Sequence, residues 1–358
     1  MDFEKFVNEM KENIREYLPE KYDQADISVH ENQKLNGSYM GLFVHMPDQV
    51  VTPTVNLNQM YESYQAGEAT MDELLGKAAK MVQIDPIEID LDHLKDYDQA
   101  KDHLFIRVSA VEANKELLEN VPHKTYEDLA VTYHIATNIG EDGIASTTIN
   151  QQILESYGVS QEQLHADALA NSEKLFPAKV ESLGAVMRRM MSTDMLATGM
   201  SQEDVDMMMD GMGLDDSNPM TVVSNDRSMN GAAVLFYPGQ MDHVAEKMEG
   251  DYFILPSSVH EMLVIPDTGE FAHEELKGMV TEINATQVEP QDRLTDEVYH
   301  YDSKDRVFEK ADKFAERQKQ KEMKAERDGL GAEKAAGKDA VKAQPAQKPK
   351  HKSNDMSL

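Results

Sequence analysis

Cysteine is absent from this chain of 358 residues, and several familiar signatures of function are absent with it. Without cysteine the protein can form no disulfide, no thiolate zinc site and no cysteine nucleophile. No uninterrupted apolar run approaches the roughly 18 residues that a membrane helix requires, so we expect no membrane partner. The first residues carry apolar side chains at helical spacing between charges, which is typical of a helix docked on a core and not of a signal peptide. We therefore expect a cytoplasmic protein.

Motifs for nucleotide binding and for serine nucleophiles are missing too. The sequence has no Gly-x-Ser-x-Gly elbow and no Gly-Lys-Ser or Gly-Lys-Thr triplet. The Gly211-Met212-Gly213 segment lacks the later glycine and the preceding strand of a dinucleotide-binding loop. We therefore predict no cofactor.

Basic residues are scarce except near the C-terminus. The chain has 35 Lys and Arg against 66 Asp and Glu, which gives a formal net charge of −31. From Ser303 onward there are 15 basic and 10 acidic residues, so the preceding 302 residues carry a net charge of −36. An acidic body repels phosphate backbones, which makes nucleic-acid binding unfavourable there. Solubility explains this charge most simply, and an acidic mimic of DNA that occupies a basic protein is the alternative.

The order of the segments predicts an α+β fold, with antiparallel or mixed sheets flanked by helices in one body over residues 1–302. A charged helix is expected over 303–328. Residues 329–358 have too few apolar side chains to supply a core, so we predict a disordered tail. Lysines in this tail could tether acidic surfaces or nucleic acid weakly, although a solvated tail is the simpler interpretation.

Apolar periodicity indicates where the individual elements lie. Thr70 and Ser160 precede two of the helical patterns and are predicted to cap them. The main expected strands cover 27–31, 39–45, 104–110, 129–135, 145–149, 221–224, 232–237, 252–255, 262–265 and 297–301. The main expected helices cover 57–65, 71–82, 160–175, 241–248 and 270–283.

Residues 187–218 form a methionine-rich insertion, and two lobes over 1–186 and 219–302 could meet beside it. Clustered thioethers can bind copper(I), so a soft-metal site is one interpretation. The other interpretation is a short helix after Ser201. Its apolar side chains would form either a flexible flap over the core or an adaptable surface that binds a partner. In that helix Val205, Met208, Met209 and Met212 are expected to face one way.

The segment around His260 combines a hydroxyl, an imidazole and a carboxylate within an apolar run. Ser258, His260 and Glu261 are therefore the catalytic candidates of this sequence. A catalytic triad, however, needs side chains that converge from separate segments. The spacing of Ser258 and Glu261 also fits a capping box at the start of a helical turn, and we favour this structural interpretation.

Histidines near the same segment could form a metal site. His243, His260 and His273 lie within about thirty residues of acidic chain, and three histidines are an acceptable zinc set. His260-Glu261 is not followed by a second histidine at the spacing of a His-Glu-x-x-His motif. We therefore predict no metal and keep the three histidines as candidates only.

Several separated motifs occur in order along the chain: Lys34-Leu35-Asn36-Gly37, Tyr61-Glu62-Ser63-Tyr64-Gln65-Ala66-Gly67, Asn230-Gly231-Ala232-Ala233, Tyr237-Pro238-Gly239, Leu255-Pro256-Ser257-Ser258-Val259-His260-Glu261 and Asn284-Ala285-Thr286-Gln287-Val288. With these motifs the chain resembles a bacterial family known only as domain of unknown function 5688. The resemblance covers roughly residues 1–302 and implies no activity, substrate or catalytic residue, because none is established for the family. Such proteins look typical of gut-type anaerobic bacteria and are often associated with mobile elements.

The leading hypothesis from these observations is a non-enzymatic protein that binds a protein partner, in the biology of a mobile element. Missing catalytic signatures, the methionine-rich insertion and the segregated charge favour it. The alternative is a hydrolase or metal-dependent enzyme that uses His260 with Glu261 or with another carboxylate brought close by folding.

Overall fold

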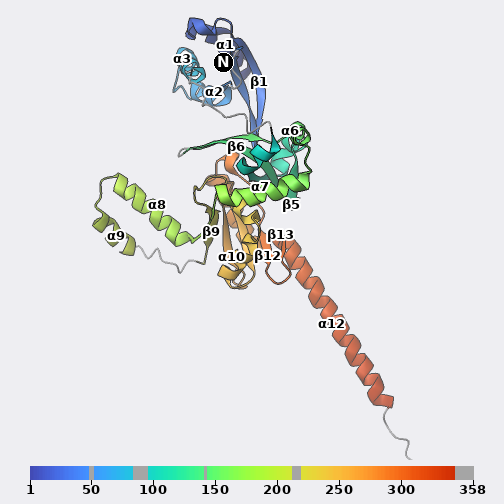
Figure 1. Cartoon of the computed structure of the whole chain (residues 1–358). Coiled ribbons are helices and arrows are strands. Elements are labelled where there is room, and N and C mark those ends of the chain that lie inside the picture. The colour runs from blue at the N-terminus through green and yellow to red at the C-terminus, as the bar shows by residue number, and fades with distance from the viewer. Residues whose placement is uncertain (48–51, 84–95, 141–142, 212–218, 343–358) are drawn as a thin grey trace, which may run out of the picture. The chain divides into compact units, whose positions relative to one another are not determined.

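The computed structural model describes residues 1–47, 52–83, 96–140, 143–211 and 219–342. The chain divides into two units, Met1–Glu309 and Lys310–Leu358. Within the described residues, helices accompany three sheets whose registered strand pairs are all antiparallel, so the fold is α+β as predicted (Figure 1). No helix in this part of the chain is long and apolar enough to cross a membrane.

The N-terminal region builds a core of its own. Its helices surround buried side chains that include Phe6, Met10 and Leu42. Thr70 caps α3 with a capping box, as predicted, because its hydroxyl accepts from the N–H of Glu73 while the Glu73 carboxylate accepts from the N–H of Thr70. The elements here are α1 (Phe3–Asn13), η1 (Ile14–Tyr17), η2 (Glu20–Tyr22), β1 (Asp26–Lys34), β2 (Gly37–His45), β3 (Thr54–Asn56), α2 (Leu57–Gln65) and α3 (Met71–Val82).

A four-stranded sheet follows, in which β6 pairs with three other strands. Ser160 caps the long helix α7 through the N–H of Gln163, as predicted. This helix packs on β4, where the Asn171 side-chain amide donates to the carbonyl of Leu104 at 2.9 Å. The elements are α4 (Tyr97–Ala100), η4 (Lys101–His103), β4 (Leu104–Ala110), η5 (Glu112–Asn114), α5 (Lys115–Leu118), β5 (His123–Tyr126), β6 (Leu129–Ile139), β7 (Ile144–Thr148), α6 (Gln151–Tyr157) and α7 (Gln161–Leu175).

The third sheet has six strands in the order β13-β12-β10-β11-β9-β8. Two helices, α8 and α9, are inserted between its edge strand β8 and β9 (Figure 1). The elements are β8 (Ala178–Ser182), α8 (Leu183–Ala197), α9 (Gln202–Gly211), β9 (Thr221–Asn225), η6 (Gly231–Phe236), α10 (Gln240–Met248), β10 (Tyr252–Ser258), β11 (Glu261–Pro266), α11 (His273–Thr286), η7 (Pro290–Asp292), β12 (Tyr299–Asp302) and β13 (Val307–Lys310).

Most buried apolar residues of the described chain belong to two hydrophobic cores. One core holds buried residues of the N-terminal region up to Val82. The other begins at Ala100 and unites side chains on both sides of the methionine-rich segment, such as Tyr133 and Ile254. The four-stranded and six-stranded sheets therefore share one core.

One expected strand is wrong. The apolar run from Ala232 forms the 3₁₀ helix η6, in which all residues from Gly231 to Phe236 are buried. A short run of apolar residues fits a buried helical turn as well as a buried strand, so periodicity could not distinguish them.

The second unit contains one long helix, α12 (Ala311–Lys342). This helix continues beyond the end at residue 328 that the sequence suggested, since its alanine, lysine and glutamate residues all have high helix propensity. Residues 343–358 of the predicted disordered tail lie outside the described residues.

Candidate functional site

Ser258, His260 and Glu261 lie at a tight turn between two strands. Ser258 ends β10, Glu261 begins β11, and the two residues pair across the turn. The Ser258 hydroxyl accepts a hydrogen bond from the backbone N–H of His260 at 3.1 Å, which is a local turn bond. The expected capping box at a helical turn is therefore wrong. Strand pairing satisfies the backbone groups that a helix cap would have served.

Both ring nitrogens of His260 have partners. Nδ1 accepts a hydrogen bond from the backbone N–H of Asn230 at 3.2 Å, which places the proton of the neutral ring on Nε2. Nε2 lies 3.5 Å from Oδ1 of Asp292. Glu261 accepts a hydrogen bond from the hydroxyl of Ser257 at 3.3 Å instead. The structure thus brings His260 to Asp292, while Ser258 and Glu261 have other partners.

The Asn230-Gly231 motif packs directly against this turn. Asn230 has a φ of 54°, a left-handed conformation that asparagine tolerates better than most residues. A Cβ atom on Gly231 would lie 2.1 Å from Oγ of Ser224 and 2.5 Å from the carbonyl oxygen of His260. The Ser224 hydroxyl donates to that same carbonyl at 2.7 Å. Only glycine fits this close approach, so the motif and the His260 turn form one packed unit.

The three histidines considered as metal ligands do not form a metal site in the described part of the chain. His243 is exposed on α10, and His273 starts α11 with its Nδ1 3.2 Å from Glu274. Among the described residues, no group of three or more histidine, aspartate or glutamate side chains could hold a metal ion.

The four-stranded sheet has two faces of opposite chemistry. Residues directly opposite each other in antiparallel strands point to the same side of the sheet. One side carries apolar residues such as Ile106, Tyr133 and Ile135 and contributes to the main core. The other side, which we call the polar face, carries Phe105, Arg107, Ser109, Thr132, His134, Ser146 and Thr148.

Arg107 is the charged residue of the polar face. Its Nη2 donates to the Ser146 hydroxyl at 3.0 Å, and its guanidinium carbon lies 5.3 Å from the centre of the Phe105 ring. Nε is buried and has no hydrogen-bond partner in the described structure. No described carboxylate lies within ion-pair distance of this guanidinium. Burial lowers the pKa of Arg107, but an arginine still keeps its charge at neutral pH.

His134 lies next to Arg107 on the same face. Its Nε2 is 2.9 Å from the Thr132 hydroxyl, and its Nδ1 is 3.2 Å from that of Thr148. Burial, together with the positive charge of Arg107, holds the pKa of His134 well below its usual range. His134 is therefore a neutral imidazole at physiological pH.

A cavity of about 610 Å³ joins the polar face to the His260 turn. We call it the Arg107 cavity. Asn36, in the turn of the β1–β2 hairpin, fastens one wall because its side-chain amide donates to the carbonyls of Gln291 and Arg293, both at 2.8 Å. The cavity is lined by Gln33, Lys34, Leu35, Arg107, Val108, Leu117, His134, Ile144, Ala145, Ser146, Thr148, Asn230, Val259, His260, Gln291 and Asp292.

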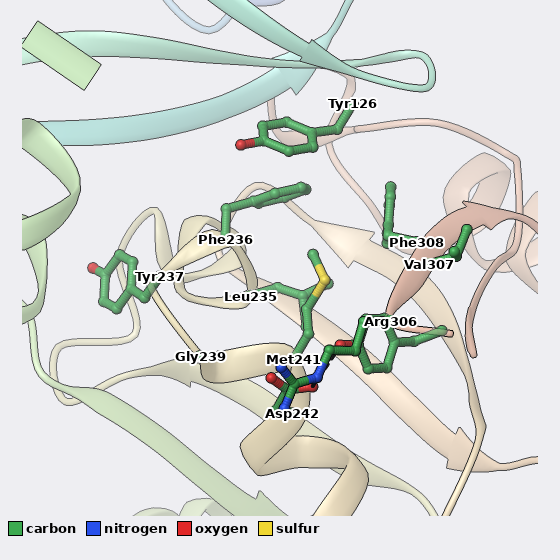
Figure 2. Close-up of a pocket in the computed structure, with 11 residues that line it drawn as sticks. Tyr126, Leu235, Phe236, Tyr237, Gly239, Met241, Asp242, Arg306, Val307 and Phe308 are labelled. Atoms are coloured by element: carbon green, nitrogen blue, oxygen red, sulfur yellow. Dashed lines mark hydrogen bonds and ion pairs between the residues drawn. The ribbon is translucent and has the colours of Figure 1, made fainter. Parts of the chain in front are cut away.

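A second cavity, of about 540 Å³, is lined mainly by aromatic side chains (Figure 2). Phe236 packs against Tyr126, with 4.8 Å between ring centres, and against Phe308, with 5.7 Å. Asp242 accepts a hydrogen bond from the Tyr301 hydroxyl at 2.7 Å and lies 3.3 Å from Nε of Arg306. The charges of this aromatic cavity therefore neutralise each other.

Helices α8 and α9 expose much of their apolar surface. Val205 and Met209 are buried, whereas Met190 and Met207 are 63% and 75% exposed. Met208 is exposed too, although we expected it to face the same way as Val205, and Met212 lies outside the described residues. We call the exposed group the methionine face; it consists of Met187, Met190, Leu196, Met207 and Met208.

Sequence reasoning identified His260 but missed Arg107, His134 and Asp292. Arg107 and His134 each interrupt a strand whose other residues are mostly apolar, which is a usable signal, because an ionisable group in such a strand needs an explanation. Asp292 had no such signal, since it follows Pro290 in a short polar segment.

The fold and these cavities define an α+β protein with two sheets on one shared core. The chain belongs to the family of unknown function DUF5688, whose sequence profile matches residues 3–303. No curated protein and no solved structure matches the chain.

Proposed function

We propose that this is a cytoplasmic, non-enzymatic protein that binds a protein partner through the methionine face of α8 and α9. The observation that carries the proposal is the concentration of exposed apolar side chains on these two helices. Of the nine large apolar residues exposed in the described structure, five belong to this face. Exposed apolar patches of this kind mark interaction surfaces more often than single exposed residues do.

The helix pair already has an internal contact that uses other side chains. Val205 and Met209 are almost fully buried, at 0% and 1% exposure, and α8 packs against α9. The methionines of the methionine face, by contrast, are exposed. Methionine is flexible and polarisable, so such a surface can adapt to the shape of a partner.

The acidic residues of α9 indicate which kind of partner surface would fit the methionine face. Glu203, Asp204 and Asp206 are exposed on α9 beside the apolar side chains. A partner that offers an apolar groove with basic residues at its rim would complement both features. Its association should therefore weaken as salt concentration rises.

The decisive test is a pull-down from the native host with surface variants. In the test variant, Met190, Met207 and Met208 are each changed to glutamine. In the control variant, Met279 and Met323, which are exposed on other helices, receive the same change. We expect wild type and control to recover the same specific protein and the test variant to lose it.

The recovered protein should then bind the purified chain directly, with a salt-dependent affinity. Recovery of identical proteins by wild type and both variants would contradict the proposal. The family resemblance extends the proposal to mobile genetic elements, and a partner encoded by such an element would support that extension.

A further inference from the structure

Arg107 is a half-buried cation with no counter-ion among the described residues, in a chain whose acidic residues greatly outnumber its basic ones. From its position we propose that the Arg107 cavity binds a small molecule that carries an oxyanion, either a carboxylate or a phosphate, with Arg107 as the anchoring cation. This ligand site is independent of the methionine face.

The cost of burying Arg107 is the first argument. Placing a charge in the protein interior is expensive unless the charge is paired and hydrogen bonded. Arg107 has one hydroxyl partner, Ser146, and one ring contact, Phe105, while its buried Nε has no partner in the described structure. An oxyanion can accept two parallel N–H bonds from a guanidinium, which would satisfy this unused donor.

The lining of the cavity is the second argument. Among the described lining residues, Lys34 and Arg107 are cationic, and Asp292 is the single carboxylate. That carboxylate is directed to His260 Nε2, at 3.5 Å. Hydroxyl groups of Ser146 and Thr148 add hydrogen-bonding partners. The cavity is thus locally basic in an acidic chain, which favours an anion over a cation.

Size and shape define the rest of the ligand. A cavity of about 610 Å³ lies within the usual range for small-molecule sites and is far larger than one oxyanion group. Leu35, Leu117 and Val259 provide apolar walls for a short carbon skeleton. A small organic acid or a small phosphate ester fits these features.

The aromatic cavity offers a contrast that supports this choice. Its cation, Arg306, lies 3.3 Å from Asp242, so its charge is already balanced. The Arg107 cavity differs from this second cavity because its guanidinium has no carboxylate partner among the described residues.

Isothermal titration calorimetry with four sodium salts tests the proposal. The probes are inorganic phosphate, glycerol 3-phosphate, acetate and succinate, all at one ionic strength set with sodium chloride. Two of them carry phosphate and two carry carboxylate, so their order of affinity distinguishes the two sources of the oxyanion. We expect at least one probe to bind the wild-type chain in or below the millimolar range.

Two variants address Arg107 in different ways. Arg107→Gln removes the charge, and Ser146→Asp places a carboxylate beside the guanidinium and neutralises it by an ion pair. We expect both to weaken binding at least about tenfold, which corresponds to about 1.4 kcal/mol. The exposed Arg227, changed to glutamine, is the matched control and should keep wild-type affinity.

Ser146→Asp decides the result if Arg107→Gln does not fold, because the new ion pair should support the fold. Failure of every probe to bind the wild type would overturn the proposal. Wild-type affinity in Ser146→Asp would overturn it as well, since the anion would then bind elsewhere.

Discussion

The polar face of the four-stranded sheet and the methionine face of α8 and α9 differ in opposite ways from the usual distribution of side chains, in which charged residues are exposed and large apolar residues are buried. The polar face buries a histidine, His134, and half-buries an arginine, Arg107, whereas the methionine face exposes residues such as Met190 and Met207. Each arrangement lowers stability or solubility by itself. Proteins tend to retain such departures where a ligand or partner compensates for them.

The difference between the two faces indicates two kinds of binding. A buried face that holds a cation beside a cavity suits a small charged ligand. An exposed face of flexible apolar side chains suits a macromolecule that covers it. Stability measurements can separate these features from ordinary packing.

The largest effect on the free energy of unfolding should come from a substitution on the apolar side of the four-stranded sheet. Ile135 is next to His134 on β6 but points to the other side, where it is fully buried in the main core. We expect Ile135→Ala to lower the free energy of unfolding by about 2–5 kcal/mol, through lost burial and a new cavity. Urea denaturation measures this change. A loss similar to that for Ile144→Ala, at a half-buried position on β7, would contradict the division into two faces.

A medium effect on the free energy of unfolding should come from lowering the pH, because His134 resists protonation in the folded chain. The pKa of His134 in the folded chain is well below the ordinary histidine value of about 6.5, so below about pH 6.5 the unfolded chain binds more protons than the folded one. Stability is then complete above pH 6.5 and falls as the pH falls, by at most about 1.4 kcal/mol per pH unit for one histidine.

The variant His134→Gln should therefore lose less stability between pH 7.5 and pH 5.5 than wild type in urea denaturation. Part of the slope should remain, because burial also lowers the pKa values of His165 and His300. The exposed His243, changed to glutamine, serves as the control. An unchanged slope in His134→Gln would show that His134 does not contribute to it.

The smallest effect should come from the methionine face. Met207→Gln and Met208→Gln should each change the free energy of unfolding by less than about 0.5 kcal/mol, because both side chains are exposed. The neighbouring Met209 is buried, so Met209→Ala should cost about 2 kcal/mol or more. Equal losses at Met208 and Met209 would mean that the methionine face is part of a core.

Local signals in the sequence were enough to predict most of the fold. The strand expected over 104–110 coincides with β4, and the helix capped by Ser160 coincides with α7. Capping residues and apolar periodicity act over a few residues, so one sequence reveals them. The short strand β5 was missed, because its four residues have no strand pattern of their own and pair with β6 through tertiary structure.

The candidate site was less predictable for a physical reason. His260 is unusual in its own segment, but its partners, Asn230 and Asp292, come from distant parts of the chain. The Arg107 cavity likewise combines residues that are far apart in the sequence, such as Lys34, Arg107 and His260, and only folding brings them together. Which side of a strand faces a cavity depends on these long-range contacts.

The central claim is that the half-buried charge of Arg107 on the polar face serves ligand binding and not stability. The most direct measurement determines both quantities for Ser146→Asp in one preparation, with urea denaturation for stability and calorimetry with the tightest-binding anion for affinity. We predict that stability is equal to or higher than that of wild type and that anion binding is lost. Unchanged anion affinity would contradict the claim, and so would a marked loss of stability.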